Sequence, residues 1–112
     1  MKIKKEKIYD FAVLYIDGRI DTVNSTSLEA ELEQLQAGGE KRIILDCHDL
    51  NYISSSGLRV FLNAQKKTIS SQGKLFLCNM QLPIREIFDI SGFSSIFTIY
   101  NTLEEALGQD KR

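Results

Sequence analysis

The chain has 112 residues, which suits one compact domain and leaves no room for a second hydrophobic core. Apolar residues make up 43% and charged residues 26%, a balance typical of ordinary globular proteins. The net charge of −1 argues against a nucleic-acid-binding protein, because such a protein needs an excess of Lys and Arg facing the phosphates.

The first third of the chain predicts a hairpin followed by a helix. Two short strands over residues 3–8 and 11–16 surround a tight turn at Tyr9 and Asp10. The apolar spacing then becomes helical, with leucines at positions 28, 32 and 35. This helix begins between Thr22 and Thr26, where several residues could serve as the cap, and a pair of glycines at positions 38 and 39 ends it.

The rest of the chain alternates strands with helices. Residues 42–47 and 75–78 are nearly continuous apolar runs, as expected of strands covered on both faces, and residues 97–100 predict a last strand. The helix between the first two runs is indicated by Leu58, Phe61, Leu62 and Ile69 and closes near Gly73. A helix with Pro83 at its first position carries Ile84, Ile87 and Phe88 and stops at Gly92. Thr102 and Glu105 form a capping box for a final short helix.

The predicted order is therefore β-β-α-β-α-β-α-β-α, a single α/β domain over residues 1–112. Strands that alternate with helices imply right-handed crossovers and a mostly parallel sheet. We expect a mixed sheet of about five strands, with the N-terminal hairpin as its antiparallel part, and about four helices.

The sequence favours a cytoplasmic protein that works without a metal or cofactor. No apolar run approaches the roughly 20 residues that span a bilayer, so we expect no membrane contact. The N-terminus is basic but lacks the apolar stretch of a secretory signal. Cys47 and Cys78 have no partner at metal-ligand spacing, and we interpret both as buried reduced thiols.

The most unusual segment, residues 49–59, links the strand at 42–47 to the helix that contains Leu58. In an open α/β sheet, functional sites gather where strands feed into helices. Three serines, at positions 54, 55 and 56, fall at the expected start of this helix. One reading makes them only a helix cap, because a serine hydroxyl can accept a bond from an unpaired amide one turn later.

The other reading makes a serine here the site of a regulatory phosphate. A helix N-terminus offers free amides and a partial positive charge, so it can stabilise an added phosphate. Phosphorylation would add about −1.5 to −2 charges without melting the helix. Gly57 suits both readings, because a residue without a side chain lets another backbone approach closely.

The stretch from Asp46 to Val60, centred on the sequence YISSSGLRV, resembles the signature of STAS-domain anti-sigma factor antagonists. That pattern runs from an acidic residue or serine into the acceptor serine, a small residue and then Gly-Leu. Residues 18–21 (GRID) resemble the family's turn after the second strand. Residues 87–93, 97–100 and 104–107 also fit, so the resemblance covers essentially the whole chain in order.

The resemblance implies a binding switch and no enzymatic activity. The unphosphorylated protein would bind an anti-sigma factor that is also a serine kinase of the histidine-kinase-like ATPase fold, and binding would free the sigma factor. Phosphorylation would end the complex until a PP2C-type phosphatase restores the protein. Position by position, Ser55 is the acceptor, Ser56 is the small residue before Gly57, and Ser54 stands where Asp is frequent.

Serine at position 54 leaves the acceptor without an adjacent carboxylate and leaves three neighbouring hydroxyls as candidates; the register favours Ser55. The predicted partner-binding residues are Asp21, Asn24, Tyr52, Ser54, Ser56, Gly57 and Arg59. For Asp21, Asn24 and Arg59 a second reading stays open: a loop cap, a helix cap and a solvated side chain, respectively. His48 is the sole histidine and offers no serine–histidine–acid arrangement, and we assign turn formation to the flanking Asp46 and Asp49.

Two other functions compete with this one. A STAS subunit could instead serve a response-regulator phosphatase or a membrane transport complex without meeting a sigma factor. A small enzyme or nucleotide-binding protein is a further alternative. Against it, the sequence has no Gly-rich phosphate loop and no base paired with a nucleophile.

Overall fold

The computed structural model describes residues 1–110, which contain five strands and four helices in the predicted order. Two short 3-10 segments, Phe93–Ser95 and Gly108–Asp110, are additional. The strands are β1 (Lys2–Ile8), β2 (Phe11–Ile20), β3 (Arg42–Ile53), β4 (Lys74–Cys78) and β5 (Thr98–Tyr100). The helices are α1 (Ser25–Ala37), α2 (Ser55–Ser70), α3 (Leu82–Ile90) and α4 (Leu103–Leu107).

All five strands belong to one sheet, in the order β1-β2-β3-β4-β5. β1 and β2 pair antiparallel, as their two-residue connection requires, while the later pairs are parallel and are joined through helices. The mixed, mostly parallel sheet with an N-terminal hairpin is thus confirmed.

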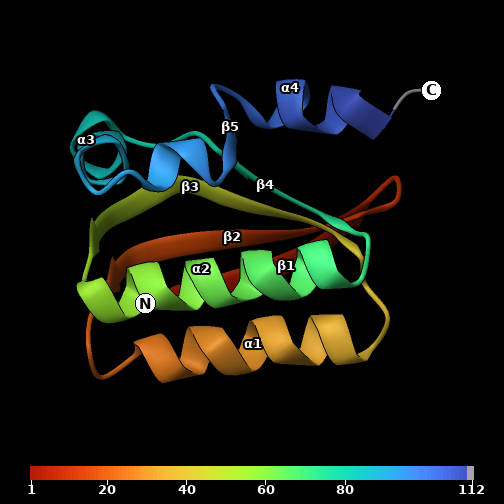
Figure 1. The fold of residues 1–112 in the computed structure, drawn as a ribbon, viewed down its shortest axis with the longest axis horizontal. Coiled ribbons are helices and arrows are strands. Elements are labelled where there is room, and N and C mark those ends of the chain that lie inside the picture. Colours follow the sequence, from red (N-terminus) through yellow and green to blue (C-terminus); the bar gives the residue numbers. More distant parts are fainter. Residues whose placement is uncertain (111–112) are drawn as a thin grey trace.

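The helices are divided unequally between the two faces of the sheet (Figure 1). α1 and α2 lie side by side along one face, and with α3 they enclose the main core, which includes Leu28, Phe61 and Phe88. Among residues 1–110 the opposite face carries a single helix, α4, whose Ala106 packs into a smaller cluster around Phe11 and Phe76. None of the helices within residues 1–110 is both long and apolar enough to cross a bilayer.

Two strands are longer than the sequence predicts. β2 continues to Ile20 and β3 to Ile53, and the two pair along this extension with register shifts after Tyr15 and Gly18. The extensions are rich in polar residues that resemble a loop, but bulges let these side chains face solvent while Leu50 stays in the core. Asp46 and Asp49 therefore lie within β3, and the assignment of turn formation to them was wrong.

Two details of the helices also differ. Ile69 is 63% exposed, so its assignment to the apolar face of α2 was wrong; the buried end of that face is Thr68. Gln36 of α1 donates to the Thr68 hydroxyl, which explains how a polar residue is accommodated there. α3 begins at Leu82, so Pro83 is its second residue and not its first, a position that also needs no backbone donor.

Cys47 and Cys78 are free and buried, as expected. Burial raises the pKa of Cys47 well above its ordinary value, with smaller effects from Cys78 and Asp46. The pKa of Cys78 is raised to about 12, first by burial and then by the charges of Asp46 and Glu104. Both thiols are therefore protonated at neutral pH, and the thiolate, which is the reactive form, is scarce.

We expect both cysteines to resist thiol reagents as long as the protein is folded. With 5,5′-dithiobis(2-nitrobenzoic acid) at pH 8, two equivalents should react at once in 6 M guanidinium, but far more slowly in buffer. Rapid reaction of either thiol in the native protein would contradict its burial and raised pKa.

Candidate functional site

The serine segment lies at one end of the molecule, where β2 and β3 end and α1 and α2 begin (Figure 1). The backbone amide of Ser54 donates to the carbonyl of Ile20 at 2.9 Å, and this bond joins the two strand ends. Parallel strands bring their carboxyl ends to the same edge of a sheet, so the topology itself creates this rim. We call the segments 19–24 and 52–59 the switch rim.

Ser54 is the N-cap of α2. Its hydroxyl accepts a 3.1 Å hydrogen bond from the amide of Gly57, and the side chain is buried with 9% exposure. The cap reading of the serine run therefore applies to this residue. It also explains why Ser serves well here in place of Asp, because both side chains cap a helix effectively.

The next two serines are placed differently. Ser55 is the first residue of α2 and is exposed, whereas Ser56 is partly buried. The amides of a first helical turn have no partner within the helix, and no acidic residue occupies the first turn of α2. Ser55 is thus the hydroxyl of the run that combines exposure with the positive end of a helix.

Arg59 lies four residues after Ser55 and is exposed. Residues separated by four positions share a face of a helix, so Arg59 is placed on the same side as Ser55, one turn further on. An arginine there can pair with an anion held at the helix start.

We expect the cap to make Ser54 and Ser55 respond differently to alanine. Ser54→Ala should lower the free energy of unfolding by about 1 kcal/mol, because the Gly57 amide loses its acceptor. Ser55→Ala should change it by less than about 0.5 kcal/mol, as for other exposed positions. Urea unfolding followed by circular dichroism measures both, and equal losses would contradict the assignment of the cap.

Gly57 is needed for close packing under the helix. A Cβ at this position would lie 2.7 Å from Ile20 Cγ2 and 2.8 Å from Ile53 Cγ1, both closer than real contacts allow. The glycine lets α2 sit directly on the ends of β2 and β3, which fixes where Ser55 emerges. Ser54 and Gly57 thus offer little exposed surface to a partner, although partner contact was predicted for both.

Asp21 and Asn24 hold the turn between β2 and α1 by a reciprocal pair of bonds. Asp21 Oδ1 accepts from the amides of Val23 and Asn24, and Asn24 Oδ1 accepts from the amide of Asp21 at 2.8 Å. This is the geometry of a capping box, with Asp21 as the physical cap of a first turn that leads into α1. Asn24 occupies the position directly before α1 but does not cap it with its side chain.

An arginine–tyrosine stack on the switch rim was missed by the sequence analysis. The Arg19 guanidinium lies 4.3 Å from the centre of the Tyr52 ring, and the two residues are paired in register across β2 and β3. Tyr52, predicted to contact a partner, is 39% exposed. The two side chains meet because of the cross-strand register. That register depends on bulges that cannot be predicted from the sequence.

This geometry suits an exposed binding surface with a hydroxyl at its centre. Cations at positions 19 and 59 and the start of α2 favour anions, while Tyr52 and the 85%-exposed Val23 provide apolar contact area. The chain's sole histidine, His48, is exposed and pairs with Asp49 at 2.9 Å, so it is not bonded to a serine of the run as a catalytic base would be.

Comparison with known proteins places this rim in a family. Residues 2–106 match the STAS domain. The chain belongs to the STAS family. This confirms the resemblance drawn from the serine signature.

Several relatives are named anti-sigma factor antagonists. The chain is 42% identical to BtrV of Bordetella bronchiseptica, whose name assigns it to this class, over 95% of this chain and 91% of that protein. A crystal structure of an anti-sigma factor antagonist from Mycobacterium paratuberculosis superposes with a TM-score of 0.90 at 21% identity, covering 99% and 94% of the two chains. SpoIIAA of Bacillus in its phosphorylated form gives a TM-score of 0.77 at 22% identity, covering 96% and 98%.

Proposed function

We propose that this STAS protein is an anti-sigma factor antagonist controlled by phosphorylation of Ser55. The unphosphorylated form binds an anti-sigma factor that is also a serine kinase with the histidine-kinase-like ATPase fold, and the sigma factor is released. Transfer of phosphate to Ser55 ends the complex, and a PP2C-type phosphatase reverses the modification. The protein carries out this cycle in the cytoplasm without a cofactor.

We choose Ser55 because the serines of the run differ in burial and hydrogen bonding. The Ser54 hydroxyl is already engaged with the Gly57 amide and is buried, whereas Ser55 is exposed. A kinase must bring its nucleotide to the accepting oxygen, which favours the exposed hydroxyl. The relatives support the partner class, since several are named antagonists of anti-sigma factors, and SpoIIAA exists in a phosphorylated form.

We assign partner contact to the exposed part of the switch rim. Tyr52 and Arg59 provide exposed side chains, and the partly buried Ser56, Asp21 and Asn24 belong to the same rim. Ser54 and Gly57 act on the interface through the backbone position that they impose on Ser55. A new phosphate in the middle of such a surface would have to be desolvated on binding, and this cost weakens the complex.

Affinity purification from the source cells separates this function from the alternative. Recovery of a kinase-like ATPase with the wild-type protein, and its loss when Tyr52 and Arg59 are both changed to Ala, is the expected result. A matched control is the double change of Lys66 and Ile69 to Ala, because both residues are exposed on α2 away from the rim. Recovery of a transporter subunit or a response-regulator phosphatase instead would favour a STAS subunit of another complex.

A further inference from the structure

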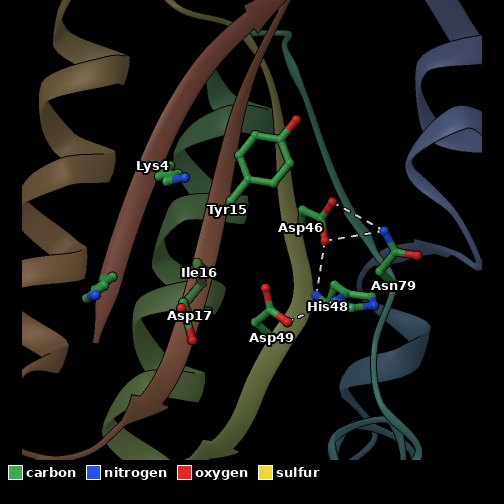
Figure 2. A pocket seen from close by; sticks show the side chains of 9 residues that line it. Lys4, Tyr15, Ile16, Asp17, Asp46, His48, Asp49 and Asn79 are labelled. Carbon is green, nitrogen blue, oxygen red and sulfur yellow. Dashed lines mark hydrogen bonds and ion pairs between the residues drawn. The ribbon is translucent and has the colours of Figure 1, made fainter.

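The sheet face opposite α1 and α2 contains a pocket that the proposed function does not use (Figure 2). Its volume is about 330 Å³, within the range of pockets that hold small molecules. Its floor is formed by Tyr15 and Asp17 of β2 and by Asp46 of β3, and Asn79 closes one side. At about 3.3 Å per residue along a strand, Asp46 lies roughly 20 Å from Ile53 at the switch rim.

Asp46 is the main chemical feature of this pocket. It is only 5% exposed, yet its carboxylate accepts from just two groups, the Asn79 side-chain amide at 3.2 and 3.3 Å and the His48 backbone amide at 3.0 Å. An ionised carboxylate has about four acceptor positions, so Asp46, which lines the pocket, retains capacity for a further donor. Within residues 1–110 no cationic side chain forms an ion pair with it, although buried charges are normally paired.

The charge of Asp46 contributes to the raised pKa values of two neighbouring side chains. The pKa of Tyr15 is raised to about 12, chiefly by burial and by its hydrogen bond to Glu6, and the Asp46 charge adds to the increase. Asp46 also contributes to the raised pKa of Cys78. Asp17 adds a second carboxylate to the floor, and Asp49, which is bonded to His48 at 2.9 Å, adds a third to the lining.

The edge of the pocket carries the opposite charge. Lys2 and Lys4 of β1 line it, and they pair in register with Asp17 and Tyr15. The alternate lysines of the same strand point to the helical face, where Lys5 and Lys7 form ion pairs with Glu31 and Glu40. In the described chain Lys2 and Lys4 form no such pair, so their ammonium groups can serve a ligand.

We propose that this pocket binds a small zwitterion, whose protonated amine contacts Asp46 and whose carboxylate lies toward Lys4 and Lys2. A divalent metal ion is a poorer match, because within residues 1–110 no three His, Cys, Asp or Glu side chains are placed to hold one. A purely anionic ligand would meet the carboxylates of the floor, and a purely cationic ligand would leave the lysines unused.

Three probes with the same carbon chain test this charge pattern: 5-aminovalerate, pentylamine and valerate. In ¹⁵N-HSQC titrations of the full chain, 5-aminovalerate should shift the amides of Tyr15, Asp46 and Asn79, with a Kd at least about tenfold lower than either single-charge probe. No saturable shift with 5-aminovalerate, equal affinity for pentylamine, shifts that map to residues 52–59, or the same shifts with MgCl₂ alone would each overturn the proposal.

Matched lysine variants locate the carboxylate end of the ligand. Lys4→Met should abolish the preference for 5-aminovalerate over pentylamine, whereas Lys5→Met, on the other face of β1, should retain it. Asp46→Asn should remove binding of both amines; because this residue is buried, Asp17→Asn at an exposed position provides a second test that leaves the fold intact. Retained preference in Lys4→Met, or unchanged affinity in both aspartate variants, would contradict the assigned orientation. None of these variants touches the serine run, so phosphorylation of Ser55 is tested independently.

Discussion

Replacing Ser55 with Asp should strongly weaken binding to the proposed anti-sigma factor partner while leaving the fold intact. The carboxylate places a negative charge at the centre of the switch rim, where it must be desolvated on binding. Such unfavourable charge placement costs several kcal/mol, so we expect an affinity loss on the order of 100-fold. At the same time, a carboxylate in the first turn of α2 should raise the stability of the free protein by about 0.3–1 kcal/mol.

The control for this variant is Ser70→Asp at the other end of the same helix. Ser70 is also exposed and is the last residue of α2, so the substitution adds an identical charge away from the rim. The helix dipole disfavours a carboxylate at the C-terminal end. The free energy of unfolding should therefore fall by about 0.3–1 kcal/mol, while binding is retained. Calorimetric titration with the anti-sigma factor and thermal unfolding measure both effects. Tight binding by Ser55→Asp would show that Ser55 does not lie in the interface.

The second large effect is expected at Gly57. In Gly57→Ala the new methyl group would meet Ile20 and Ile53 at 2.7 and 2.8 Å, and both side chains are themselves buried. Overpacking of this kind costs about 1–3 kcal/mol, whereas the better helix propensity of Ala returns at most about 1 kcal/mol. We therefore expect a net loss of about 1–2 kcal/mol, which lowers the melting temperature by roughly 4–16 °C in a domain of this size.

Gly108→Ala is the matched control, because nothing lies within 4 Å of a Cβ built there and its φ of −59° suits any residue. Its melting temperature should stay near that of the wild type. If Gly57→Ala proved as stable as Gly108→Ala, α2 would not be seated as closely on the strand ends as the structure has it. Larger residues at position 57 should lower the melting temperature further. Gly57→Val should also reduce binding, because it displaces the start of α2 and with it Ser55.

The element order could be predicted from the sequence because each buried segment has an unmixed pattern. The strand at Leu75 to Cys78 is apolar throughout, and the leucines of α1 recur at helical spacing. The lengths of β2 and β3 could not be predicted. The last residues of both strands are largely polar and contain bulges, and in the sequence such a segment is indistinguishable from a loop. The predicted burial of Ile69 was wrong because an apolar, β-branched residue suggested the core. The neighbouring polar Thr68 is buried there instead.

The serine run and the family signature predict a candidate site at the start of α2, and the structure adds which hydroxyl forms the cap. The Arg19–Tyr52 stack and the Asp21–Asn24 capping box depend on contacts across strands and turns, and no local pattern encodes them. The pocket above Asp46 has the same origin, since β1, β2, β3 and the segment after β4 all contribute to it.

Phosphate mapping tests the central claim most directly. The protein is incubated with ATP and the kinase-like ATPase recovered with it by affinity purification, and the modified residue is located by mass spectrometry in the wild type and in the Ser54→Ala, Ser55→Ala and Ser56→Ala variants. We predict a single phosphate on Ser55, retained in the first and third variants and absent from the second. A phosphate outside residues 54–56, or one that persists in Ser55→Ala, would contradict the account.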